Sequence, residues 1–281
     1  MKSPDELFGA SSEEIFGVST EEAYKKFLEE PEKPDTARDK ENKKLRESYV
    51  LLPQTKTYAL GVQALREAYS KTKESVHPLF TRDDGSKTVR PLTFKENIEC
   101  RVNDYETLKD SKGDEKSKED RLKLFKVWLD SCTGLAYKAK TNKFKIQPVC
   151  EKLITIKPDS KQAFLDVDYN SFKGLELDSS KGLYNELLTK REVVNHEGWN
   201  AALQGDTKLL KAYADIIFKE KDSPNMMGFW TRKQTDQDEL RGLFVGNLDC
   251  NSNSFGYYYL SNVGSFLLVV HAQKNKGEVR I

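Results

Sequence analysis

The stretch that most constrains how this chain can fold lies near its carboxyl end, in residues 242–272. It contains no Lys, Arg, Glu, Gln, Met or Trp, although 46 of the 281 residues in the whole chain are Lys or Arg. Two apolar runs border its polar middle, residues 243–245 and 266–270. Runs of such composition, punctuated by glycine, are typical of strands. The stretch therefore predicts two core strands that hold a polar and aromatic segment out to solvent.

The segment between the two predicted strands is rich in Asn, Ser, Gly and Tyr. Tyr offers rigid amphipathic contact area at a low entropic cost, and Ser, Asn and Gly offer adaptable hydrogen bonding. An ordinary polar loop, or a half-buried strand through Tyr257, Tyr258 and Tyr259, is the alternative interpretation. Long loops in compact domains tend to be functional or disordered, and a merely solvated loop does not need aromatic residues. The composition therefore favours a binding surface.

The run LRGLFVGNLDCNSNSFGYYYLSNVGSFLLV, residues 240–269, resembles the variable region of proteins diversified by diversity-generating retroelements. In that family, Asn codons of the AAY type are rewritten into codons for residues such as Ser, Tyr, Asp, Phe and Val. The positions that the resemblance marks as variable and ligand-binding all carry residue types reachable in this way: Asn247, Asp249, Asn251, Asn253, Phe255, Tyr257, Tyr258, Tyr259, Ser261, Asn262 and Val263. The fixed scaffold between them would be Leu248, Gly256, Leu260 and Phe266.

The resemblance implies a C-type-lectin fold of the kind shared with formylglycine-generating enzymes, and a non-enzymatic protein that binds diverse targets. Variable side chains on such a scaffold should point outward and make few core contacts. The tripeptides through which calcium-dependent lectins bind sugar (EPN, QPD, WND) do not occur in this chain. The formylglycine-generating branch uses paired cysteines near its C-terminus, and the lone Cys250 does not reproduce them. Both departures argue against calcium-dependent glycan binding and against catalysis.

The order of predicted elements is mixed helix and strand with a strand-rich end, which indicates the α+β class. We expect a helical, partly flexible N-terminal extension in residues 1–87 and a C-type-lectin-like domain in residues 88–281, with its variable region at about 242–271. Helical spacing of apolar residues and turn signals predict several elements. These are helices at 1–51, 58–69, 121–129, 182–188 and 200–218, strand material at 88–102, a loop at 104–120, and a hairpin at 135–145 with its tip at 141–142.

Several function classes find no support in the sequence. The net charge of +1 argues against a general phosphate-backbone binder, and a solvated strand face explains Lys138, Lys140, Lys143 and Lys145 better than a nucleic-acid ribbon does. No apolar run approaches the roughly 20 residues that span a bilayer. The first residues lead into an acidic segment without the apolar core of a secretory signal, so we expect the cytoplasm as the default location. The dispersed cysteines and histidines lack metal-ligand spacing. We therefore expect neither a metal nor a cofactor.

Three hypotheses remain, in order of preference. The first is a recognition protein whose target, a protein or cell-surface ligand, the sequence does not identify. The second is an interaction scaffold in which the C-terminal stretch is core, and burial of residues 257–259 would favour it. The third is an enzyme on the same fold, in which Cys250, His271 and a carboxylate would have to meet within hydrogen-bond reach.

Overall fold

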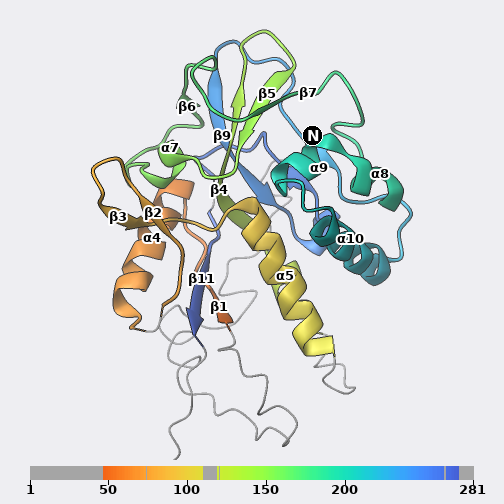
Figure 1. The fold of residues 1–281 in the computed structure, drawn as a ribbon, viewed down its shortest axis with the longest axis horizontal. Helices are drawn as coiled ribbons and strands as arrows, with labels where there is room; N and C mark the ends of the chain where they lie inside the picture. Colours follow the sequence, from red (N-terminus) through yellow and green to blue (C-terminus); the bar gives the residue numbers. More distant parts are fainter. Residues whose placement is uncertain (1–46, 74, 110–118, 120, 263, 272–281) are drawn as a thin grey trace, which may run out of the picture.

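A central sheet organises the molecule in a computed structural model, which describes residues 47–73, 75–109, 119, 121–262 and 264–271. The seven strands run in the order β7-β5-β4-β9-β10-β8, with β6 also pairing β9 (Figure 1). All pairings are antiparallel except that of β10 with β8. The strands are β4 (Leu129–Tyr137), β5 (Lys143–Gln147), β6 (Leu165–Asp166), β7 (Leu175–Asp178), β8 (Phe229–Trp230), β9 (Glu239–Val245) and β10 (Ser254–Phe255).

Helices cover both sides of this sheet. α4 (Tyr58–Lys71) lies on one side, near the small β2–β3 hairpin (Leu79–Thr81 and Lys87–Val89), and the other side carries the remaining long helices (Figure 1). The other helical segments are α5 (Phe94–Lys109), η2 (Lys123–Phe125), α7 (Glu151–Ile154), α8 (Lys190–Asn195), α9 (Glu197–Ala202), α10 (Thr207–Lys221) and η3 (Leu248–Cys250).

The strands β4 and β9 are buried on both faces, which divides the core into two clusters. Leu135 and Leu243 pack with the side chains of α5, α9 and α10, whereas Ala136 and Leu240 pack with those of α4. A strand covered on both faces reads as a near-continuous apolar run instead of an alternating one. This explains the uninterrupted burial of all seven residues of β9.

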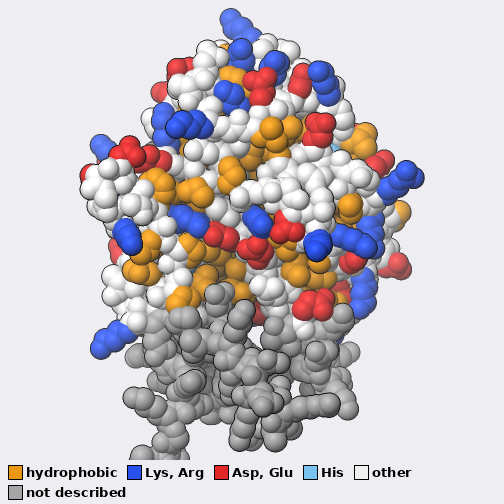
Figure 2. Space-filling view, in the orientation of Figure 1, with side chains coloured by type: hydrophobic (Ala, Val, Ile, Leu, Met, Phe, Trp, Pro, Cys, Tyr) orange, Lys and Arg blue, Asp and Glu red, His pale blue; other side chains and the backbone are white. Residues whose placement is uncertain are grey.

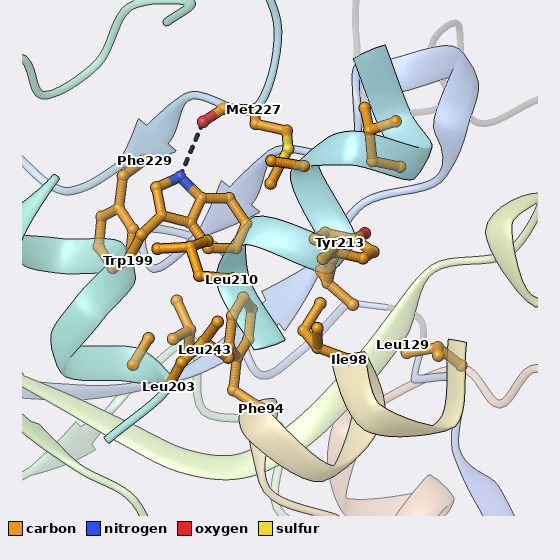
Figure 3. Close-up of a cluster of buried hydrophobic side chains, with 14 of the residues drawn as sticks. Phe94, Ile98, Leu129, Trp199, Leu203, Leu210, Tyr213, Met227, Phe229 and Leu243 are labelled. Atoms are coloured by element: carbon orange, nitrogen blue, oxygen red, sulfur yellow. Dashed lines mark hydrogen bonds between the residues drawn. The ribbon is translucent and has the colours of Figure 1, made fainter. Parts of the chain in front are cut away.

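Trp199 lies at the centre of the larger cluster (Figure 3). It is fully buried, its ring centroid lies 5.6 Å from that of Phe94 and 6.0 Å from that of Phe229, and its indole Nε1 donates to the Met227 carbonyl over 2.8 Å. Buried indoles usually find such a partner for the N–H group. The prediction that Trp199 packs in the core is confirmed.

The two ends of the described chain meet. β1 (Glu47–Leu51) pairs antiparallel with β11 (Leu267–His271), so that Leu51 lies opposite Leu267. Val62 and Leu65 of α4 are fully buried in the same cluster as Leu268. Strand β1 and helix α4 therefore share a core with the C-terminal strand. The expected helix over 1–51 is a strand from residue 47 on, and its residues 1–46 lie outside the described part of the chain.

The α+β class is confirmed, but several predicted elements are wrong. Residues 121–129 contain only the short η2 and then enter β4, because a short apolar run does not distinguish a buried strand from a helix. The strand expected at 88–102 is largely α5, which also takes in residues 104–109 of the expected loop. Thr93 opens it through a reciprocal pair of bonds with Glu96, a capping-box signal present in the sequence.

Other expected elements compare as follows. The helix at 58–69 and the hairpin at 135–145 are confirmed as α4 and β4–β5. The helix expected at 200–218 is present as α9 and α10, and the Asp206 side chain caps α10 by accepting from the Leu209 amide. Residues 182–188 form no helix, because Tyr184 and Leu188 make isolated bridges to the segment around β8. Among the described residues, no helix is both long and apolar enough to cross a bilayer.

Replacing Trp199 by alanine should reduce the free energy of unfolding by about 3–5 kcal/mol, because it removes a large buried side chain and leaves a cavity. The measurement is equilibrium urea unfolding followed by far-UV circular dichroism. Leu187→Ala is the control, since Leu187 is 39% exposed, and we expect it to change stability by less than about 0.5 kcal/mol. Equal losses in the two variants would contradict the central position of Trp199.

His77 should make the fold sensitive to mild acid. Its Nδ1 accepts from the Val269 amide of β11 and its Nε2 donates to the Arg90 carbonyl, and burial lowers its pKa to about 4. The unfolded chain binds a proton near pH 6.5 that the folded chain does not. The stability contributed by neutral His77 is therefore fully present above pH 6.5 and is lost as the pH falls towards 4, by about 3 kcal/mol in all.

The measurement is urea unfolding of the native chain and of His77→Gln between pH 7 and pH 4. We expect the decline in stability to be smaller in the variant, which keeps hydrogen-bonding groups but does not titrate. Parallel pH profiles for the two proteins would show that His77 is not responsible.

Candidate recognition surface

The candidate site begins where β9 ends, in a tight turn around η3. Gly246 donates its amide to the Asn253 carbonyl over 2.8 Å, which closes the turn, and the Asn247 side chain accepts from the Cys250 amide over 2.9 Å. Asn251 and Ser252 have positive φ angles of 59° and 50°. Asn is among the few residues that adopt this left-handed conformation readily. Asn247 and Asn251 therefore help to shape the turn as well as lie at its half-buried surface.

The middle of the predicted variable region is buried. Asn253 is only 6% exposed, and its Oδ1 accepts from the Gly228 amide over 2.7 Å. Phe255 is 9% exposed and stacks on Phe244, with ring centroids 5.2 Å apart and planes 11° apart. The expectation that every variable side chain points outward is wrong for Asn253 and Phe255. Both lie in or beside β10, which is paired on both sides by β9 and β8, so their side chains meet core atoms.

The other predicted positions lie at the surface. Tyr257 is 36% exposed and Tyr259 45% exposed, and they are two of the exposed large hydrophobic side chains of the described chain. The Asp249 side chain is exposed and pairs with Lys221 over 2.8 Å. Half-buried positions complete this set, which we call the display face: Asn247, Asp249, Asn251, Tyr257, Tyr258, Tyr259, Ser261 and Asn262. Val263 lies outside the described residues.

Backbone contacts with the core hold the loop that carries the three tyrosines, residues 256–262. At its start, Gly256 donates to the Trp230 carbonyl and accepts from the Tyr137 hydroxyl, each over 2.8 Å. At its far end, the Leu260 amide donates to the Ala163 carbonyl over 2.8 Å, and the Leu260 carbonyl accepts from the Tyr58 amide. A Cβ at Gly256 would lie 2.3 Å from the Leu135 side chain, so the site requires glycine.

The four residues expected to form the fixed scaffold are all enclosed by the core. Gly256 is enclosed as described, and Leu248, Leu260 and Phe266 are 8%, 4% and 2% exposed. Phe266 also makes an edge-on contact with Tyr58, with ring centroids 5.2 Å apart. The structure thus places buried anchors between exposed positions along one loop.

Three residues outside the predicted set belong to the candidate site. Trp128 is half-buried, and its ring centroid lies 5.2 Å from that of Phe255. Arg241 lies beneath the loop, and its Nη1 donates to the Tyr257 carbonyl over 2.9 Å. Lys221 meets Asp249 from the end of α10. The only sequence signal among them is Arg241, a charge that, with Glu239, interrupts the otherwise apolar run ELRGLFV of β9.

Two ionisable side chains at or beside the display face have shifted pKa values. Burial raises the pKa of the half-buried Cys250 thiol, and the Asp249 carboxylate raises it further, which keeps the thiol protonated at neutral pH. Burial also raises the pKa of Tyr257. The side chain of His271 lies outside the described part. In that part no three His, Cys, Asp or Glu side chains form a group that could hold a metal ion.

Charge is mixed on the face of the molecule that Figure 2 shows, where Lys and Arg alternate with Asp and Glu around a band of hydrophobic side chains. Because positive and negative side chains are interspersed, this face of the molecule has no broad electrostatic potential of one sign.

No protein-family model matches this chain, and no curated protein sequence matches it either. A search of solved structures found a similar fold in a structure described as "Accommodation of massive sequence variation in Nanoarchaeota by the C-type lectin fold". The match has a TM-score of 0.50 at 18% sequence identity, and covers 82% of this chain and all of the other. At this identity the likeness shows the fold and no more. The chain therefore adopts a C-type-lectin fold.

The division between buried and exposed asparagines predicts different costs of substitution. Asn253→Ala leaves the Gly228 amide buried without its acceptor, which should lower the free energy of unfolding by about 1–3 kcal/mol. Asn262→Ala, at the half-buried rim of the loop, should change it by less than about 0.5 kcal/mol. Thermal and urea unfolding of the two variants provide the measurement. Equal tolerance at both positions would show that Asn253 belongs to the display face after all.

Proposed function

We propose that this chain is a non-enzymatic recognition protein that binds its target through the display face defined above. Tyr257, Tyr258 and Tyr259 are the aromatic anchors, because aromatic side chains dominate the binding energy of many interfaces. Asn247, Asp249, Ser261 and Asn262 adjust hydrogen bonding around them. The target is a protein or cell-surface ligand.

One observation carries the proposal: exposed tyrosines lie on a loop whose main chain is tied to the core at both ends. A solvated loop without a ligand has no need to hold large amphipathic rings at its surface, and their ordered backbone reduces the entropy lost on binding. The interaction scaffold, in which these rings would be buried core, fits the exposure of Tyr257 and Tyr259 poorly. The protonated Cys250 thiol gives the enzymatic alternative no support.

We further propose that the display face is diversified by a retroelement. The similar structure is described as accommodating massive sequence variation on the C-type-lectin fold, and the residue types at the display face are those that adenine-directed copying produces. Sequencing the DNA around the coding region provides the test. We expect a near-copy of the segment for residues 242–266, with adenines at the differing positions, beside a reverse-transcriptase gene. A locus without such a copy would remove the proposed diversification, although not the binding.

Replacing Tyr257, Tyr258 and Tyr259 together by alanine should abolish target binding without unfolding the chain. The full chain and the variant would be compared by crosslinking to intact cells, with mass spectrometry of the captured surface proteins. A matched control replaces Leu175, Leu183 and Leu187, which are exposed elsewhere, by alanine. We expect the same target with the native chain and the control, and its loss with the tyrosine variant. Capture that survives in the tyrosine variant would refute the assignment of the anchors.

A further inference from the structure

Arg241 is a buried cation in the central strand. It is 1% exposed, and its neighbour Glu239 on the same face of β9 is 3% exposed. The two side chains form a bidentate pair, in which Arg241 Nε donates to Glu239 Oε1 over 3.1 Å and Nη2 donates to Oε2 over 2.9 Å. Planar bidentate pairing fixes the direction of a guanidinium as well as its position. The remaining donor atom, Nη1, therefore points in one defined direction.

That direction is towards the loop that carries the tyrosines. Nη1 donates to the carbonyl oxygens of Tyr257 and Tyr258, over 2.9 Å and 3.3 Å. The guanidinium carbon also lies 4.7 Å from the centre of the Tyr259 ring and 5.4 Å from that of Phe164, so two aromatic rings pack around the cation. All three consecutive residues of the loop thus contact one side chain from the sheet beneath.

We propose that Arg241 is the positioning residue of the display face, setting the path of residues 257–259 independently of the side chains that they carry. The inference rests on the proposed function for its significance, since it explains how one surface keeps its shape while its residues change. The contacts at 257 and 258 are made to carbonyl oxygens, which every amino acid possesses. Only the ring contact at 259 depends on the residue present.

The burial of the Arg241–Glu239 salt bridge supports a role for Arg241 in setting the path of the loop. A buried ion pair seldom adds net stability, because the cost of desolvating two charges offsets their attraction. Lys could not replace Arg241, since a single ammonium lacks the fork that binds a carboxylate and a carbonyl at once. Arg232 also lies near Glu239, with Nε 3.4 Å from Oε1, so the carboxylate keeps a cation when Arg241 is changed.

Hydrogen exchange measured by mass spectrometry on the full chain, without any ligand, tests this assignment. The reporters are the amides of Leu260 and Asn262, which donate to the carbonyls of Ala163 and Tyr259, and the amides of α10 report on the core. In Arg241→Met with Glu239→Gln, which removes both charges, we expect Leu260 and Asn262 to exchange at least about tenfold faster while α10 stays protected. In the triple alanine variant at 257–259, we expect protection within about threefold of the native chain.

Two results would overturn the proposal: unchanged protection in the Arg241 variant, or protection lost in the triple alanine variant. If the double variant does not fold, Arg241→Lys keeps the charge beside Glu239 but not the fork. Chymotrypsin should then cut after Tyr257, Tyr258 or Tyr259 more than about tenfold faster than in the native chain. The control is Arg82→Lys, the same exchange at an exposed arginine in the turn between β2 and β3. A cleavage rate equal to that of the native chain would count against Arg241.

The outcomes also separate this inference from the proposed function. Exchange and proteolysis need no ligand, so unaltered exchange in the Arg241 variant removes the positioning role and leaves the binding proposal intact. A triple alanine variant that keeps its loop protection and still captures the target removes the binding proposal and leaves the positioning role.

Discussion

The structure depends on one strand, β9, that is covered on both faces. Its backbone pairs with β4, β6 and β10, and its side chains contribute to both core clusters. A strand in this position leaves little freedom to its surroundings, because shifting its register by one residue would exchange the two faces. It also carries Arg241, the buried charge beneath the display loop. The strand at the centre of the core therefore also holds, through Arg241, the loop that carries the three tyrosines.

The C-terminal segment divides into framework and display in a way that follows from its hydrogen bonds. The Asn247 side chain accepts from the Cys250 amide within the turn around η3, and the Asn253 side chain accepts from the buried Gly228 amide. In the loop from Gly256 to Asn262, the backbone groups of Gly256 and Leu260 bond to other segments, and the carbonyls of Tyr257 and Tyr258 accept from Arg241. These bonds hold the loop without using its side chains. Asn253 is therefore structural, Asn247 both shapes its turn and lies at the half-buried surface, and Ser261 and Asn262 of the loop are available for contact.

This division has a consequence for how far the surface tolerates change. Asn and Ser are suited to binding surfaces because they hydrogen-bond adaptably, but the same property allows them to stabilise turns. Composition alone cannot separate the two roles. Exposed aromatic rings indicate a binding role more clearly, because aromatic side chains are usually buried. The exposed Tyr257 and Tyr259 therefore define the display face more clearly than any of the asparagines.

Much of the fold could be predicted from the chain itself. The apolar runs at residues 243–245 and 266–270 determined strands, the spacing in α4 and α10 determined helices, and the mixture determined the α+β class. The helix predicted at residues 121–129 was wrong, because a short apolar run does not show whether neighbouring segments will cover one of its faces or both. For the candidate site, the sequence identified the segment and its three tyrosines, since their composition departs from the rest of the chain. Only the tertiary structure decided that Asn253 and Phe255 face the core, and that Trp128, Lys221 and Arg241 join the loop, because such contacts arise from segments far apart in sequence that pack around one buried strand.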